Sequence, residues 1–142
     1  MLRVVVDTNV LISALLKANG NPAKVVSLWR TGEFELVISS ETIDELSRVL
    51  GYERIRTRVT PEEAERFLYL LQTAATIITP QIEVTAVEDD PDDDKFLGLA
   101  LASDAEYIVS GDKHLLSIKV FRGIPILTPV QFLETISSST TE

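Results

Sequence analysis

The stretch RVVVDTNVLISALLK, residues 3–17, decides the fold. Its first four residues form a short β-branched run that is typical of a buried strand. From Asp7 onward the spacing is helical, with Val10, Leu11, Ala14 and Leu15 on one side. A strand that passes directly into such a helix predicts one unit of an α/β fold.

The same alternation continues along the chain. Runs typical of strands are FELVIS (34–39), ATIITP (75–80), EYIVSGD (106–112) and IPILTP (124–129). Runs with helical patterns are NPAKVVSLWRTG (21–32), SETIDELSRVLG (40–51), TPEEAERFLYLLQTAA (60–75), DKFLGLALAS (94–103) and TPVQFLETI (128–136). The pattern predicts one α/β domain over residues 1–136, with a central, mostly parallel β-sheet and helices on both faces. Residues 137–142 are expected to form a disordered tail.

Composition excludes several kinds of chemistry. The 142 residues include no cysteine and one histidine, His114. Cysteine nucleophiles and thiolate zinc sites are therefore excluded. No G-x-S-x-G motif accompanies that histidine. A net charge of −9 argues against general coating of nucleic acid, which requires neutralising many phosphates. No run reaches the roughly 18 to 20 apolar residues of a membrane span, and no signal peptide is evident, so we expect a cytoplasmic protein.

Acidic residues of separate elements are predicted to converge. Asp7 and Asp112 each end a predicted strand, and carboxyl ends of parallel strands form one edge of the sheet, where ligands bind. Asp94 and Glu45 lie on or beside the apolar stripes of two predicted helices. No arginine or lysine is placed to neutralise all four acids. Clustered oxygen ligands suit Mg²⁺ or Mn²⁺, so the sequence predicts a metal site at this edge.

The segment EDDPDDD, residues 88–94, has two interpretations. Blocks of like charge are usually solvated loops. Alternatively, some of these carboxylates face inward and share a cation. The spacing of Asp94 to Leu97 and Leu101 places it on a core-facing stripe, where an unpaired charge is costly to bury.

The motifs VVVDTNVLISALL, ETIDELSRVL and DPDDDKFLGLALASDAEYIVSGDKHLL, in this order and spacing, resemble the PIN-domain ribonucleases. The closest likeness is to a toxin branch related to VapC-type toxins, and it extends over residues 2 to 134. The resemblance implies an enzyme that uses Mg²⁺ or Mn²⁺ to hydrolyse RNA, leaving a 5′-phosphate and a 3′-hydroxyl. It also implies an antitoxin protein and a homodimer as expected partners.

Matched by position, the family's acidic quartet corresponds to Asp7, Glu45, Asp94 and Asp112, as catalytic residues and metal ligands. The polar positions that support the quartet correspond to Asn9, Ser13 and Ser110. Within the acidic run, Asp93 is expected to assist and Asp92 to cap the helix, whereas residues 88–90 are assigned to a solvated loop. His114 is expected at the rim of the site.

Other interpretations remain open from the sequence. An aspartyl-phosphate phosphotransferase would use Asp7 as its nucleophile, but its D-x-D pattern fails because residue 9 is asparagine. A PIN-like module could instead bind RNA or protein without cutting it. Arg54, Arg56 and Arg58 in RVLGYERIRTRV form either a solvated face or a basic strip that contacts RNA or a partner.

Overall fold

A computed structural model describes the backbone of residues 1–78 and 91–140, and the side chains of residues 1–78 and 95–137. The strands are β1 (Arg3–Val6), β2 (Glu35–Ile38), β3 (Thr76–Ile77), β4 (Tyr107–Val109), β5 (Val120–Phe121) and β6 (Ile124–Leu127). The helices are α1 (Thr8–Leu16), α2 (Asn21–Arg30), α3 (Ser40–Leu50), α4 (Glu53–Arg56), α5 (Pro61–Ala74), α6 (Pro91–Ser103), α7 (Lys113–Ile118) and α8 (Pro129–Thr140).

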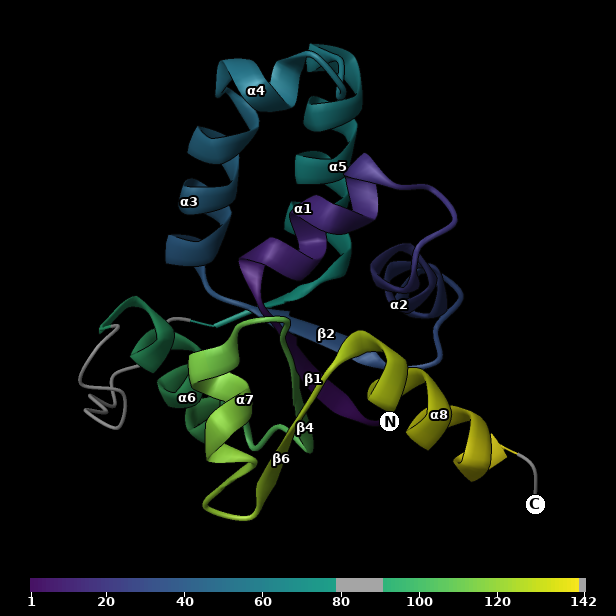
Figure 1. The fold of residues 1–142 in the computed structure, drawn as a ribbon, viewed down its shortest axis with the longest axis vertical. Coiled ribbons are helices and arrows are strands. Elements are labelled where there is room, and N and C mark those ends of the chain that lie inside the picture. Colours follow the sequence, from purple (N-terminus) through teal and green to yellow (C-terminus); the bar gives the residue numbers. More distant parts are fainter. Residues whose placement is uncertain (79–90, 141–142) are drawn as a thin grey trace.

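The strands form one sheet in the order β3-β2-β1-β4-β6-β5. All neighbours pair in parallel except β5 and β6, which are antiparallel. Helices α6 and α7 cover one face, and the remaining long helices cover the other (Figure 1). The predicted α/β architecture, a mostly parallel sheet with helices on both faces, is therefore confirmed.

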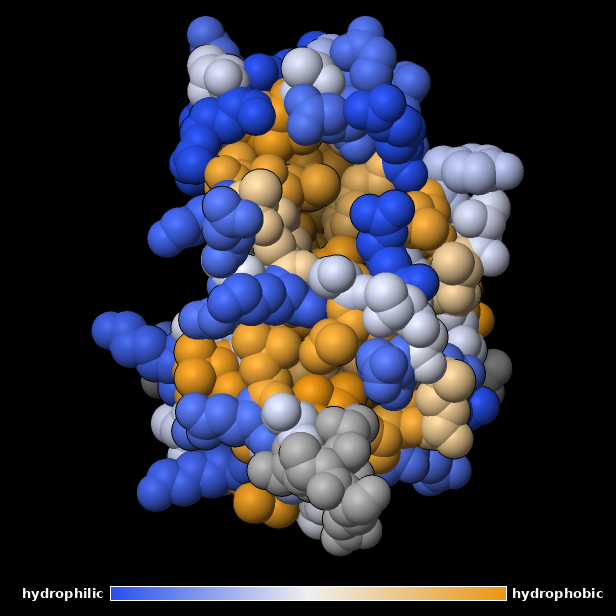
Figure 2. All heavy atoms as spheres, turned by 90° about the vertical axis from the view of Figure 1, so that its right-hand side faces the viewer, coloured by the Kyte–Doolittle hydropathy of each residue, from blue (hydrophilic) through white to orange (hydrophobic). Residues whose placement is uncertain are grey.

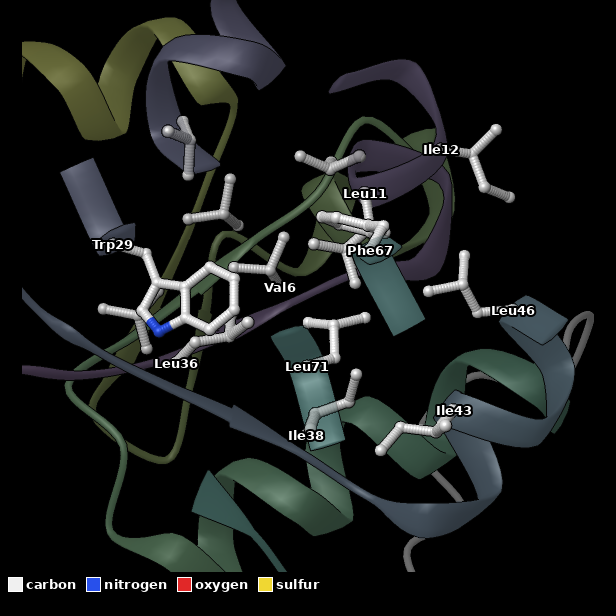
Figure 3. Close-up of a cluster of buried hydrophobic side chains, with 14 of the residues drawn as sticks. Val6, Leu11, Ile12, Trp29, Leu36, Ile38, Ile43, Leu46, Phe67 and Leu71 are labelled. Atoms are coloured by element: carbon white, nitrogen blue, oxygen red, sulfur yellow. The ribbon is translucent and has the colours of Figure 1, made fainter. Parts of the chain in front are cut away.

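Each central strand buries both of its faces. Val4 and Val6 of β1 belong to the larger apolar cluster, whereas Val5 belongs to the cluster under α6 and α7. This alternation follows from the two-residue period of a strand. In the larger cluster, Trp29 of α2 and Phe67 of α5 pack with residues of β1 and β2 (Figure 3). The two clusters fix β1 in the middle of the protein.

Helices α1, α3 and α7 each follow a strand within a few residues, and each has a polar N-cap side chain. Asp7 caps α1, Ser39 caps α3 and Asp112 caps α7, each accepting a backbone N–H of the first turn. Such caps satisfy N–H groups that have no partner inside the helix. Because β1, β2 and β4 are neighbouring parallel strands, they bring these three helix starts to the same edge of the sheet.

Several elements differ from the sequence prediction. The short helices α4 and α7 and the strand β5 were not predicted. Helix α6 begins at Pro91, so Asp92 is inside the helix and the prediction that it caps the helix is wrong. Helix α8 continues to Thr140, so its backbone includes residues 137–140, which were predicted to begin a disordered tail. Residues 88–90 and 141–142 lie outside the described part of the chain.

The surface carries an apolar hollow between helices. One shallow pocket is lined by Leu15 of α1, Val26 of α2 and Phe67 of α5, with Arg30 among its lining residues. Figure 2 shows apolar side chains lining a hollow in the upper part of the molecule, with hydrophilic side chains around it. Among the described helices, none combines the length and apolar character that a membrane span requires.

Candidate active site

The site is built where β1 and β4 end side by side. In their parallel register Val6 lies opposite Val109, and the backbone N–H of Asp7 donates to the carbonyl oxygen of Val109 over 3.0 Å. Strand β1 lies between β2 and β4 in the sheet. The next strand along the chain, β2, pairs with one side of β1, and the later strand β4 pairs with the other side. This is the point at which strand order reverses, and such points are where ligands bind in open parallel sheets.

A chain of hydrogen bonds connects the acids at these two strand ends. The carboxylate of Asp7 accepts the backbone N–H of Asn9 on Oδ1 at 2.8 Å and the hydroxyl of Ser110 on Oδ2 at 2.6 Å. Oγ of Ser110 in turn accepts the backbone N–H of Asp112 at 2.9 Å. Asp112 accepts the backbone N–H of His114 on Oδ1 at 2.7 Å. Ser110 thus fixes the two acids relative to each other.

Burial raises the pKa of the Asp7 carboxyl above its ordinary value. The side chain is only 3% exposed, and loss of water disfavours the charged form. The negative charge of Asp112 raises the pKa of Asp7 further, whereas the hydroxyl of Ser110, the N–H of Asn9 and the charge of Lys95 lower it. A cation beside Asp7 would therefore stabilise its ionised form.

The donor set fits a hard divalent cation. In the described structure each carboxylate oxygen of Asp7 receives one hydrogen bond, and each such oxygen has two lone pairs. One lone pair on each oxygen remains for a metal. Asp112 adds a second carboxylate close enough to influence the pKa of Asp7. Oxygen donors of this kind are the ligands that Mg²⁺ and Mn²⁺ prefer.

Glu45 is connected to Asp7 by Lys95, a residue that the sequence analysis did not identify as part of the site. Glu45 of α3 forms an ion pair with Nζ of Lys95, from the first half of α6. Burial lowers the pKa of Lys95, and the carboxylates of Glu41 and Asp7 oppose that shift. The sequence analysis did not anticipate Lys95, which interacts with two of the four acids, Glu45 and Asp7.

The positions of the remaining acids can be stated only in part. Asp94 and Asp93 lie in the first turn of α6, but their side chains are outside the described part of the structure. Among the described residues, no three acids or histidines are grouped closely enough to hold a metal. Asp7 and Asp112 are thus brought together, Glu45 is joined to them through Lys95, and the contribution of Asp94 stays a prediction.

The predicted supporting residues have different roles. Ser110 is buried and joins Asp7 to Asp112. Asn9 acts through its backbone N–H, and its side chain is exposed. Ser13 is exposed on α1, and within the described residues its side chain makes no hydrogen bond. His114 is also exposed, and its backbone N–H binds Asp112, which places it at the rim as expected.

All three arginines of the basic strip are exposed, but their contacts differ. The guanidinium of Arg58 donates to the carbonyl oxygen of Leu16 at 2.9 Å, which caps the last turn of α1. The guanidinium of Arg54 lies 5.7 Å from the centre of the Tyr52 ring. All three side chains are therefore accessible to a partner, and Arg58 also has a structural contact.

One further buried polar group was not anticipated. The hydroxyl of Thr8, the first residue of α1, is buried and has no hydrogen-bond partner among the described residues. It directly follows Asp7 in the chain. A threonine after a strand-ending aspartate is an ordinary helix-start pattern, so no sequence signal singled it out.

The fold and site together define an α/β protein with an acidic centre at the switch point of a parallel sheet. Residues 3–114 match the family described as PIN domain, and the chain belongs to that family. This confirms the resemblance inferred from the sequence motifs. PIN domains are generally nucleases, and PIN nucleases typically use divalent metals.

Individual proteins are similar to this chain in sequence or in fold. The uncharacterized protein MJ1680 of Methanocaldococcus jannaschii is 31% identical over 123 residues, which cover 83% of this chain and 76% of that protein. The structure of PAE2754 from Pyrobaculum aerophilum is similar with a TM-score of 0.63 and 17% identity, covering 96% of each chain. A chain of VapBC2 from Rickettsia felis, solved with a DNA fragment from its promoter, has a TM-score of 0.54 and 14% identity, covering 89% of this chain and 98% of that chain. The last two likenesses concern the fold alone.

Proposed function

We propose that this protein is a cytoplasmic, metal-dependent endoribonuclease, and that it is the toxin of a toxin–antitoxin pair. The observation that carries the proposal is the hydrogen-bonded arrangement of Asp7, Ser110 and Asp112 at the switch point of a PIN-domain sheet. The structural likeness to a VapBC2 chain supports an antitoxin as a partner. A homodimer and an RNA substrate complete the proposed partners.

Asp7, Asp94 and Asp112 would hold Mg²⁺ or Mn²⁺, with Glu45 as a further ligand. When bound, such a cation supplies Lewis acidity for the hydrolysis of a phosphodiester. The products would be a 5′-phosphate and a 3′-hydroxyl.

The protein's own groups prepare this site before any ligand binds. Ser110 donates to Oδ2 of Asp7 and so directs the carboxylate, while the N–H of Asn9 holds Oδ1. Burial keeps water away from Asp7, and electrostatic interactions are stronger where water is excluded. Ser110 also holds the backbone of Asp112. The acids are therefore fixed in direction, which reduces the reorganisation needed on binding.

The exposed arginines of α4 would contact the RNA backbone. The chain carries a net charge of −9, so a local basic region is needed to guide a polyanion. Arg54 and Arg56 are exposed and near each other in the short α4. Arg58, which we also predicted to contact RNA, is proposed as a secondary contact because its guanidinium binds Leu16.

The test of the proposal is cleavage of single-stranded RNA with Mn²⁺ by wild type, Asp7→Asn and Asp112→Asn. Both variants should lose cleavage, because an amide cannot replace an anionic ligand, and both should fold, because asparagine is also a good N-cap. Asp44→Asn is the matched control, since Asp44 is an exposed acid beside Glu45 on α3. It should cleave like wild type.

Full cleavage by Asp7→Asn would refute the proposed site. Absence of cleavage by the wild type on any RNA would favour the alternative of a PIN-like module that binds RNA or protein without cutting. The toxin assignment has its own test: expression of the wild type should arrest bacterial growth and expression of Asp7→Asn should not. Equal growth with both would remove the toxin assignment and leave the nuclease.

A further inference from the structure

The cation that the structure places in the acidic site is a lysine side chain. Lys95 stands on α6, next to buried Phe96 and Leu97 on a helix that is otherwise largely apolar. Its side chain is 14% exposed and its partner Glu45 is 26% exposed. Long charged side chains are seldom buried to this extent unless they are paired. The position of Lys95 is therefore explained by the acids around it.

The ammonium interacts with acids on both sides of the site. It forms the ion pair with Glu45 of α3, and its charge acts on Asp7 at the end of β1. These are two of the residues proposed to bind the divalent cation. A lysine ammonium sits at the end of a flexible four-carbon chain and can change partners. It can therefore occupy or leave the acids without movement of the backbone.

We infer that Lys95 is a resident counterion that competes with the divalent cation for Glu45. This inference rests on the proposed metal site. In the metal-free protein Lys95 neutralises part of the acidic cluster. When a divalent cation binds, its positive charge repels the ammonium of Lys95. Glu45 must then break its ion pair with Lys95 to bind the metal. Lys95 thus weakens metal binding and keeps the acidic pocket stable when metal is scarce.

A competing role differs from a purely structural one in its effect on metal affinity. If Lys95 competes, removing its charge frees Glu45 and ends the repulsion, so Mn²⁺ binds more tightly. If Lys95 only orients Glu45 as a ligand, removing it weakens Mn²⁺ binding. If Lys95 only packs against its neighbours, the affinity is unchanged. Binding of Mn²⁺ alone therefore separates the three roles without any measurement of RNA cleavage.

The experiment is calorimetric titration of Mn²⁺ into metal-free wild type, Lys95→Met and Lys24→Met. Lys24 is an exposed residue of α2, so its variant has the same change in net charge away from the site. Lys95→Met should bind Mn²⁺ about tenfold more tightly than wild type, the effect of one like charge in a half-buried site. Lys24→Met should match wild type. In EDTA, Lys95→Met should melt at a lower temperature than either.

Two further variants keep the test decisive. Lys95→Arg retains the charge and should bind Mn²⁺ more nearly like wild type than Lys95→Met does. With Glu45→Gln as the background, Lys95→Met should gain much less affinity, because the contested ligand is gone. An equal gain in both backgrounds would overturn the inference.

Weaker or unchanged Mn²⁺ binding by Lys95→Met would also overturn it, as would a wild type that binds no Mn²⁺. A wild type that binds Mn²⁺ but leaves RNA intact removes only the proposed nuclease activity. Should Lys95→Met not fold, Glu45→Gln still allows the inference to be refuted. It leaves Lys95 charged and without its partner, and should bind Mn²⁺ more weakly than wild type; equal binding means that Glu45 is not contested.

Discussion

Ser110→Ala tests the hydrogen-bond chain that fixes the site. Ser110 is fully buried, its hydroxyl donates to Asp7 at 2.6 Å, and its oxygen accepts the N–H of Asp112 at 2.9 Å. The substitution removes one small polar atom and two hydrogen bonds. It leaves a buried carboxylate oxygen and a backbone N–H without their partners.

The expected cost follows from these two contacts. A hydrogen bond to a charged group contributes about 1.5 to 3 kcal/mol, and one between neutral groups about 1 kcal/mol. Above the folded pKa of Asp7, where its carboxyl is ionised, Ser110→Ala should therefore lower the free energy of unfolding by about 3 kcal/mol. With a urea dependence of about 2 kcal/mol per molar, the midpoint should fall by about 1.5 M.

The cost should shrink as the pH falls. The ordinary pKa of Asp7 is 3.8, and burial raises it in the folded protein. Between these two values the folded state binds the proton more tightly, so the free energy of unfolding decreases as pH rises. Loss of the Ser110 hydroxyl raises the folded pKa of Asp7 further and widens this window. The full cost thus appears above the folded pKa, and about 2 kcal/mol remains once Asp7 is protonated, because both lost hydrogen bonds are then between neutral groups.

The assay is urea unfolding in EDTA, followed by the fluorescence of Trp29, which is the single tryptophan and is buried. Measurements run from neutral pH down toward, but not to, the isoelectric point near 4.6, where solubility is lowest. Ser103→Ala is the matched control, because the buried Ser103 hydroxyl donates to a backbone carbonyl rather than to an acid. Its cost should be smaller and independent of pH. Equal, pH-independent costs in both variants would refute the reasoning.

Other variants test the cap, the basic strip and the acidic run. Thr60→Ala breaks the capping box of α5 and should lower the free energy of unfolding by about 1 kcal/mol, measured by thermal melts; an unchanged melting temperature would contradict this. Arg54→Gln with Arg56→Gln should reduce the salt slope of RNA binding by about two units, whereas Arg58→Gln should chiefly lower the melting temperature. Asp94→Asn should melt higher than wild type in EDTA, through relief of repulsion, and gain less stability from Mn²⁺. Equal stabilisation of both proteins by Mn²⁺ would remove Asp94 from the site.

The long elements were predictable because several signals agreed in them. The apolar run before Asp7 and the helical spacing after it fixed β1 and α1, and the pattern of Thr60, Pro61 and Glu63 fixed the start of α5. The short elements lack such agreement. Helix α4 has four residues and β5 has two, which is too few to show a helical or strand periodicity of apolar residues. They depend on tertiary contacts that sequence patterns do not contain.

The two acids that follow strands, Asp7 and Asp112, could be predicted to lie close together. Asp7 and Asp112 follow strands, and adjacent parallel strands bring their ends together. The ion pair of Glu45 was not predictable, because it joins α3 to a residue 50 positions away on α6. A lysine at the start of the apolar part of α6 was the available signal. Because Lys95 directly follows a run of acids, the sequence pattern alone indicates a solvated segment.

The strand order determines when the candidate site can form during synthesis of the chain. Asp7 and Ser110 are 103 positions apart, and they meet only when β4 pairs with β1. Contacts between such distant residues form late, since a long loop must be closed first. A nascent chain that has folded β1, β2 and β3 holds Asp7 but neither Ser110 nor Asp112. Protein synthesis therefore supplies the two halves of the candidate site separately, and a chain released before β4 contains only one of them.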